Sequence, residues 1–316
     1  MAEIALALTV LCGAGLLGRS LMQLQGVDPG FSDDSALSMR VTLPHRTYPD
    51  SHAQHTFHTR VIEALRALPE TRSAGGTSFL PLAGIGPATS FWRADQPQPA
   101  PNDRPVADAR PVTVGYFDAM GIRLLAGRDV AESDTPERDP VAVINETFAR
   151  QIYPGDSPIG RKFILNLGNE KPHEIIGVVG DVKLASLDGE IRPTAYLSSR
   201  QYAFGIMTYV IRTNGDPARL APAAVRVVRE IDPLLPVSAV RPLDEVFAES
   251  IARPRLTATA MALFARAALR RRRRLPAGAA RDQRGSGGDA EGGIGRTQCA
   301  TTDPHYSEWT TVRTLR

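Results

Sequence analysis

The chain has 316 residues, 42% of them hydrophobic, which is ordinary for a folded protein and allows two or three domains. Its 37 Lys and Arg and 34 Asp and Glu residues give a net charge of +3, but residues 266–316 hold 11 of the basic and 5 of the acidic ones. Residues 1–265 therefore carry −3, which argues against a nucleic-acid-binding surface there. The two cysteines, Cys12 and Cys299, lie nearly the whole chain apart, so no structural disulfide is expected.

The first expected element is an apolar helix. Residues 4–17 carry no charge, and Thr9 is their one polar interruption. At about 1.5 Å per residue they cover about 21 Å, less than the roughly 30 Å of a bilayer's hydrocarbon core. We expect residues 1–25 to be a truncated transmembrane helix; the alternatives are a signal-like segment, although the leader lacks basic residues, and a soluble helix. Arg19, just past the apolar run, weakly favours a cytoplasmic side for the downstream residues.

A β-α-β unit comes after this helix. Residues 36–44 alternate between apolar and polar side chains, as a half-buried strand does. A helix is expected to begin at a cap, Asp50 or Ser51, and to stop at Pro69, before a returning strand that starts near residue 71. The apolar stripe of this helix is Phe57, Val61, Ala64, Leu65 and Leu68.

A second unit of the same kind lies far downstream. It has a strand over residues 205–213, a helix with Asp216 as its cap and Pro217 in first position, and a strand over residues 237–240 that leads into a short amphipathic helix. The apolar stripe of the longer helix is Leu220, Ala224, Val227, Val228 and Ile231. The two units suggest the two halves of one split domain.

The insert between the halves is predicted to be a small mixed α+β domain. It begins with a Pro-rich linker over residues 94–111, which favours extended spacing. The further elements expected are a strand and short helix turning at Gly121, a strand over 141–144 with a helix ending before Pro154, a hairpin of strands 162–167 and 174–179 turning at Gly168-Asn169, and a strand over 193–198.

The predicted fold class is therefore α+β, with a disordered C-terminal tail. The predicted division is residues 26–81 and 200–252 as a membrane-proximal subdomain, 82–199 as an inserted outer subdomain, 253–265 as the remnant of a second membrane helix, and 266–316 as the tail.

No catalytic constellation emerges from the motifs. No Gly-Lys-Ser/Thr follows a glycine cluster, so the chain lacks a P-loop, and neither a nucleophile elbow nor a zinc signature is present. His52, His55 and His58 are spaced three apart, which places the outer two about 120° apart on a helix, and a solvated or partly buried helical face is favoured over a metal site. We predict no catalytic, cofactor-binding or metal-binding residues and no cofactor.

Three further motifs receive a structural interpretation. Residues 177–183, "GVVGDVK", favour a strand end with a turn over a phosphate loop. The glycosylation sequon at Asn145 is close to chance, and Asp33-Asp34-Ser35 is typical of a turn.

The order of the segments resembles a known family. The phrases that carry the likeness are "QGVDPGF", "VTVGYFDAMGIRLLAGRD", "VAVINETFARQIYPGDSPIGRKF", "EIIGVVGDVK", "RPTAYLS", "REIDPLLPV" and "SIARPR". Over about residues 3–262 the chain is similar to the extracytoplasmic core domain of MacB-like ABC transporter permeases, most of all to those without an ATPase of their own.

This resemblance implies a location and partners. It implies a four-helix permease of the bacterial inner membrane whose first helix leads into a large periplasmic domain, the opposite of the orientation that Arg19 favours. A separate ABC ATPase subunit and a second permease copy are the implied partners. Membrane lipid and a periplasmic partner are further implied contacts, and nucleic acid is not one. Such domains act as mechanical couplers, and the family domain is not an enzyme.

The chain departs from the family pattern at both ends. After "ARPR" the family continues with a long apolar helix, whereas this sequence runs into Arg270–Arg274 and Gly-rich text. We hypothesise a frameshift near residues 258–266, which resequencing codons 255–275 would test, and so a fragment not transport-competent alone. The alternatives for the arginine run are a lipid-facing patch and a nucleic-acid arm. The alternatives for the protein are a membrane-tethered or secreted binding module without catalysis and, less favoured, a cytoplasmic enzyme.

Overall fold

The computed structural model describes residues 27–249 except 85, 169, 170 and 188. The predictions for residues 1–25, 253–265 and 266–316, including the frameshift and the arginine run, lie outside these residues. Within the described part of the chain, no helix combines the length and hydropathy needed to cross a membrane.

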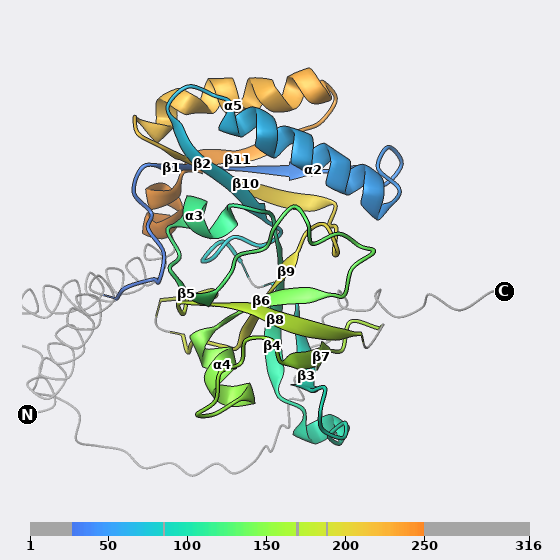
Figure 1. The fold of residues 1–316 in the computed structure, drawn as a ribbon. Helices are drawn as coiled ribbons and strands as arrows, with labels where there is room; N and C mark the ends of the chain where they lie inside the picture. The colour runs from blue at the N-terminus through green and yellow to red at the C-terminus, as the bar shows by residue number, and fades with distance from the viewer. Residues whose placement is uncertain (1–26, 85, 169–170, 188, 250–316) are drawn as a thin grey trace, which may run out of the picture. The chain divides into compact units, whose positions relative to one another are not determined.

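The two β-α-β units form one antiparallel four-stranded sheet in the order β11-β1-β10-β2 (Figure 1). The strands are β1 (Ala36–Thr42), β2 (Thr71–Thr77), β10 (Ile206–Thr213) and β11 (Val237–Pro242). Strand β10 lies between β1 and β2, and β1 lies between β10 and β11, so each unit contributes a strand to the middle of the other. The two segments that are distant in sequence thus share one sheet.

Two helices cover one face of this sheet, as their apolar stripes predicted (Figure 1). Helix α2 (Ser51–Arg66) begins at Asp50, whose side chain accepts a hydrogen bond from the Ala53 amide. Helix α5 (Pro217–Ile231) begins in the same way at Asp216. One core cluster contains the buried apolar residues of both helices together with Leu37, Met39 and Val41 of β1, which accounts for the alternation along β1.

The insert contains a closed ring of six strands. These are β3 (Ala88–Arg93), β4 (Val106–Val112), β6 (Val141–Asn145), β7 (Lys162–Leu165), β8 (Pro172–Val179) and β9 (Thr194–Ser198). The pairing runs β4-β3-β7-β8-β6-β9 and returns from β9 to β4 through a parallel ladder. Helix α4 (Glu146–Ile152) adds Phe148, which stacks on Phe91 and contacts Phe163 in the barrel core.

The structure corrects the prediction of a Pro-rich linker over residues 94–111. A short 3-10 helix, η1 (Pro101–Asp103), and a surface loop occupy its first part, but residues 106–112 form β4, which joins the ring on both edges. The physical reason is burial, because Ala107 and Ala109 face the barrel core. The proline content predicted an extended spacer, but residues 106–112 form a strand of the barrel.

A short strand and a short helix complete the insert. Strand β5 (Leu124–Gly127) pairs with β8, outside the ring. Helix α3 (Tyr116–Met120) ends at Gly121, as expected, but the strand expected just before it ends at Val112. Although α3 belongs to the insert by sequence, it packs against β2 and β10 of the four-stranded sheet.

Candidate functional site: the junction core

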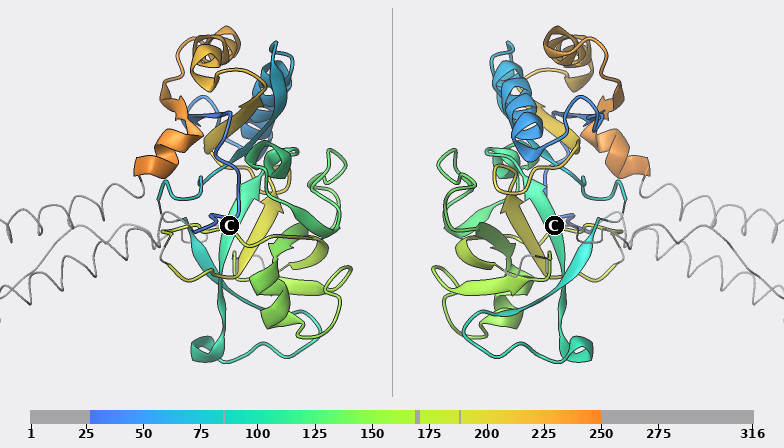
Figure 2. Two further views of the ribbon diagram at one scale, coloured as in Figure 1. Left: turned by 90° about the vertical axis from the view of Figure 1, so that its left-hand side faces the viewer. Right: turned by 90° about the vertical axis from the view of Figure 1, so that its right-hand side faces the viewer.

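One apolar cluster lies where the four-stranded sheet, the barrel and α3 meet, and we name it the junction core. It also takes in two segments that connect the described residues to the rest of the chain. The N-terminal connector, residues 27–35, contributes Phe31, and the C-terminal connector, helical residues 243–249, contributes Leu243 and Val246. Figure 1 shows both connectors on the left side of the fold, and in Figure 2 the C-terminal connector, in orange, lies at one edge.

The rest of the junction core comes from every neighbouring element. The sheet supplies Val210, and the barrel supplies buried side chains that face out of its ring. The residues from the barrel and α3 are Val112, Tyr116, Phe117, Ala119, Met120, Val141, Val143, Ile176, Val179 and Tyr196. Both connectors therefore belong to the same packed cluster as residues of the sheet and of the barrel.

Backbone hydrogen bonds seat the N-terminal connector against the insert. The Ser32 amide donates to the Met120 carbonyl at 2.9 Å, and the Lys183 amide donates to the Pro29 carbonyl at 2.9 Å. Between them, Gly30 has φ of +82°, and a Cβ at this position would lie 1.9 Å from the Asp181 carbonyl oxygen. Only glycine allows this approach, so the connector follows the surface of the loop after β8.

Arg212 on β10 clamps the same connector to α3. Its Nε donates to the Ala119 carbonyl at 3.0 Å, its Nη1 to the Asp34 carbonyl at 2.7 Å, and its Nη2 to the Ser32 carbonyl at 2.8 Å. Burial lowers the pKa of the Arg212 guanidinium below its ordinary value, and Arg72 acts in the same direction. The planar fork of arginine suits this task because it meets carbonyls in several directions at once.

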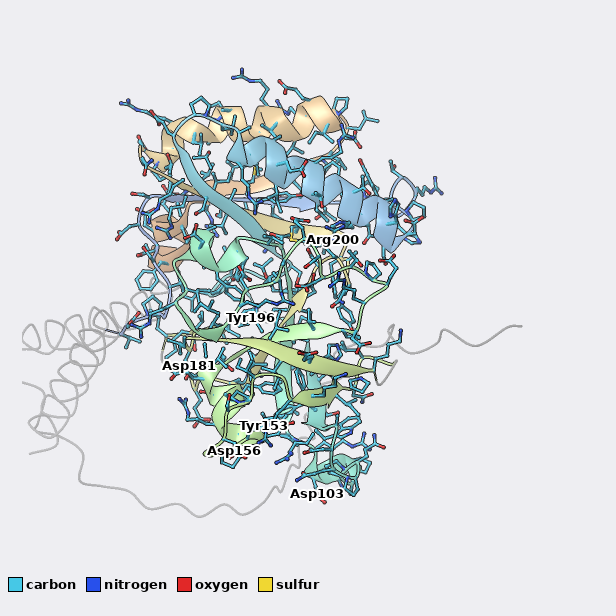
Figure 3. The ribbon with its side chains drawn as sticks, in the orientation of Figure 1. Asp103, Tyr153, Asp156, Asp181, Tyr196 and Arg200 are labelled. Atoms are coloured by element: carbon cyan, nitrogen blue, oxygen red, sulfur yellow. The ribbon has the colours of Figure 1, made fainter. Side chains whose placement is uncertain are left out.

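Asp181 fixes the loop that the connector follows. One carboxylate oxygen accepts from the Asn145 side chain at 2.8 Å and the Thr147 amide at 2.9 Å. The other accepts from the Thr147 hydroxyl at 2.8 Å and from Arg150 at 2.9 Å. Asp181 thus ties the end of β8 to the start of α4, and Figure 3 shows it near the end of β8.

A family model described as the MacB-like periplasmic core domain matches residues 4–230. The chain belongs to this family. It is 34% identical over 74 residues to the macrolide export ATP-binding/permease protein MacB of Aggregatibacter actinomycetemcomitans, and 29% identical over 76 residues to that of Mannheimia succiniciproducens. These matches cover 23% and 24% of this chain but only 11% of each relative.

Three solved structures are similar to the MacB-like chain. The periplasmic region of MacB from Actinobacillus actinomycetemcomitans has a TM-score of 0.46 at 15% identity and covers 70% of this chain and 94% of that one. The extracellular domain of the transporter YknZ from Gram-positive bacteria has 0.41 at 12%, covering 64% and 99%. A domain of a Porphyromonas gingivalis permease protein has 0.41 at 15%, covering 67% and 92%.

The three histidines of α2 have different surroundings in the MacB-like domain: His52 is exposed, His55 is half-buried and His58 is buried. His58, expected on a solvated or partly buried face, is buried: its Nε2 donates to the Phe204 carbonyl at 3.0 Å and its Nδ1 accepts from the Tyr209 hydroxyl at 2.6 Å. We assign this tautomer because a carbonyl can only accept. Burial lowers the pKa of His58 to about 4. Among the described residues, no three His, Cys, Asp or Glu side chains gather as metal ligands.

The other motifs singled out from the sequence have structural roles. Strand β8 ends at Val179, as expected for "GVVGDVK", and Asp181 comes two residues later. Asn145, the residue of the sequon, is 1% exposed and caps α4 by accepting from the Phe148 amide at 3.0 Å. The turn expected at residues 33–35 has Ser35 at a positive φ, and its Asp34 carbonyl is one acceptor of Arg212.

A cleft lies on the α2 side of the junction. His55, Thr59, Glu63 and Arg66 line it from α2, and Glu132, Ser199 and Arg200 line it from the insert. Arg200, labelled in Figure 3, donates through Nη1 to both the carbonyl and the carboxylate of Glu132, each at 2.6 Å. Arg66 donates to the Ala74 and Val114 carbonyls at 3.1 and 2.7 Å. Sequence reasoning missed Arg212, Asp181 and Arg200 because an isolated charge in a strand or loop carries no recognisable motif.

Proposed function

We propose that this chain is the extracytoplasmic core domain of an ABC transporter permease, and that it relays motion between membrane-embedded flanks and the outer insert. The proposal places the chain at the bacterial inner membrane, with its main domain on the periplasmic side. A separate ABC ATPase subunit and a second permease copy would be its partners, and the domain itself would perform no catalysis.

One observation carries the proposal: both connectors pack into the junction core, which also contains residues of the sheet and of the barrel. Close-packed interiors transmit strain because neighbouring side chains are in contact and have few voids between them. The Arg212 clamp and the backbone bonds at Ser32 and Lys183 add directional links from the N-terminal connector to the insert. Motion applied at a connector would thus reach the barrel.

The sequence carries no recognisable ATP-binding motif of the P-loop type. The 316 residues contain no P-loop, so this chain does not bind ATP by that device, whereas the curated relatives are described as combined ATP-binding and permease proteins. ATP hydrolysis, if it powers the proposed relay, would come from a site outside these 316 residues.

Whole-cell labelling tests the location. In a chain with Cys12→Ser and Cys299→Ser, Leu234→Cys places a thiol at a residue that is 90% exposed, and the adjacent Leu235→Cys places one at a residue that is 5% exposed. A membrane-impermeant maleimide should label the first variant in intact cells, with the protein resisting carbonate extraction, and the second only after denaturation. Labelling of Leu234→Cys only after lysis, or a chain recovered in the soluble cytoplasmic pool, would contradict the proposal.

A further inference from the structure

Arg110 on β4 is the largest fully buried side chain among the described residues and is 1% exposed. Its Nη1 donates to the Phe79 carbonyl at 2.6 Å, and its guanidinium lies against Gly86, where an added Cβ would be 3.2 Å from Cζ. Its Nε is buried and has no hydrogen-bond partner among the residues that the structure describes. A buried guanidinium normally has a carboxylate partner, because an uncompensated buried charge is strongly destabilising and arginine can only donate hydrogen bonds.

Three buried hydroxyls near Arg110 also lack a partner within the described part of the chain: Tyr116, Tyr196 and Ser78. Arg110 and Tyr196 are directly opposite in the β4–β9 ladder, so their side chains share a face. The rings of Tyr196 and Tyr116 have centroids 6.4 Å apart, and the Ser78 amide donates to the carbonyl of Pro111, the residue after Arg110.

This face is the one that points into the junction core. Ala109, before Arg110, belongs to the barrel core, whereas Val112 and Tyr196 belong to the junction core. The four orphaned donors thus come from four separate segments: β4, α3, β9 and the chain after β2. Figure 3 shows Tyr196 in this region, above Asp181.

Two carboxylates in this region, those of Asp108 and Asp181, have other hydrogen-bond partners. Asp108, on the same face of β4, accepts from Arg192 at 2.6 and 3.0 Å, and Asp181 is held by Arg150 and the start of α4. Burial raises the pKa of the Tyr116 and Tyr196 hydroxyls, although Arg110 acts against this rise. Both tyrosines therefore keep their protons and can donate.

We propose that Arg110, Tyr116, Tyr196 and Ser78 form a binding site for a small monovalent anion of the halide class inside the junction core. Arg110 supplies the uncompensated positive charge, and the hydroxyls supply donors that adapt by rotation. A water molecule would satisfy the hydroxyls but would leave the buried charge unbalanced, which is the costlier term. A bound anion would pin β4, β9, α3 and the segment after β2 to one point.

Anomalous scattering tests the site directly. Crystals of the full chain in detergent, grown with sodium bromide, should show a bromine peak within hydrogen-bonding distance of Arg110 Nε and the two tyrosine hydroxyls. A water molecule at that position without bromine signal, or no density there, would overturn the proposal.

A solution test uses chloride itself. The melting temperature of the full chain in detergent should rise as chloride replaces gluconate at constant ionic strength, because a ligand that binds only the folded state stabilises it. Arg110→Met should abolish the rise, and Arg219→Met, at a side chain that is 88% exposed, should retain it.

Single-oxygen deletions keep the test decisive if Arg110→Met does not fold. Tyr196→Phe and Tyr116→Phe should each lower the apparent chloride affinity by about tenfold or more, since a hydrogen bond to a charged group is worth about 1.5–3 kcal/mol. A melting temperature independent of chloride in the wild type, or equal chloride dependence in both Phe variants and the wild type, would contradict an anion site.

Discussion

Replacing Arg212 with methionine tests the clamp on the N-terminal connector. The variant retains the apolar stem but removes the donors to the carbonyls of Ala119, Asp34 and Ser32. Hydrogen bonds from charged donors contribute about 1.5–3 kcal/mol each, which would give about 4–9 kcal/mol for three bonds. Two reductions apply: Ser32 is half-buried and Asp34 exposed, so water replaces part of the loss, and burial of the guanidinium carries its own penalty.

We therefore expect Arg212→Met to lower the free energy of unfolding by about 2–4 kcal/mol, or the melting temperature by about 5–12 °C. Arg212→Lys should fall between the wild type and the Met variant, because an ammonium cannot span three carbonyls. Denaturant unfolding of the full chain in detergent measures the loss, with Arg219→Met as a control that should change stability by under about 0.5 kcal/mol. An Arg212→Met variant as stable as this control would refute the reasoning.

Three further changes probe the surroundings of the junction. Gly30 and Gly155 both have φ of +82°, but an added Cβ would meet another atom only at Gly30. Each Ala substitution should lower the free energy of unfolding by about 1 kcal/mol because of the backbone conformation, and Gly30→Ala should lower it by at least about 2 kcal/mol more because of the clash. Equal melting temperatures of the two variants would contradict the close approach. Asp181→Asn should lower the free energy of unfolding by about 2–3 kcal/mol, against under about 1 for the exposed Asp156→Asn, in parallel denaturant titrations. Burial holds the pKa of His58 at about 4, below its unfolded value, so its neutral form is favoured by folding: the stability it contributes is complete above about pH 6.5 and is lost as the pH falls towards 4. Unfolding free energies at pH 7 and 5 should thus differ by about 2 kcal/mol more in the wild type than in His58→Gln, and an unchanged pH dependence would count against the burial argument.

The elements of the four-stranded sheet could be predicted from sequence because their signals are local. Asp50, Asp216 and Pro217 act at helix starts within a few residues, and the alternation along β1 reports burial on one face directly. The repeated β-α-β pattern suggested one split domain, and in the structure the two distant units share one sheet.

The closed barrel and the clamp could not be predicted in this way. Closure depends on the parallel β4–β9 ladder, whose paired residues, such as Asp108 and Thr194, are 86 positions apart, and no local periodicity encodes such a partner. The Pro-rich composition before β4 concealed a buried strand for the same reason. Within the stretch "VIRTNG", Arg212 looks like any charged residue on a strand. Its role depends on the carbonyls of Ser32 and Ala119, which only the tertiary fold brings close to its guanidinium.

The central claim is that the N-terminal connector, α3 and the loop after β8 behave as one unit within the junction. Native-state hydrogen exchange of the full chain in detergent, followed across rising denaturant, measures the opening free energy of single amides. The amides of Ser32, Ile122 and Lys183 each donate across this junction or within α3, at 2.8–2.9 Å. We predict one common opening free energy and one common denaturant dependence for all three. Exchange of Ser32 and Lys183 through a smaller local opening, while Ile122 stays protected, would contradict the claim.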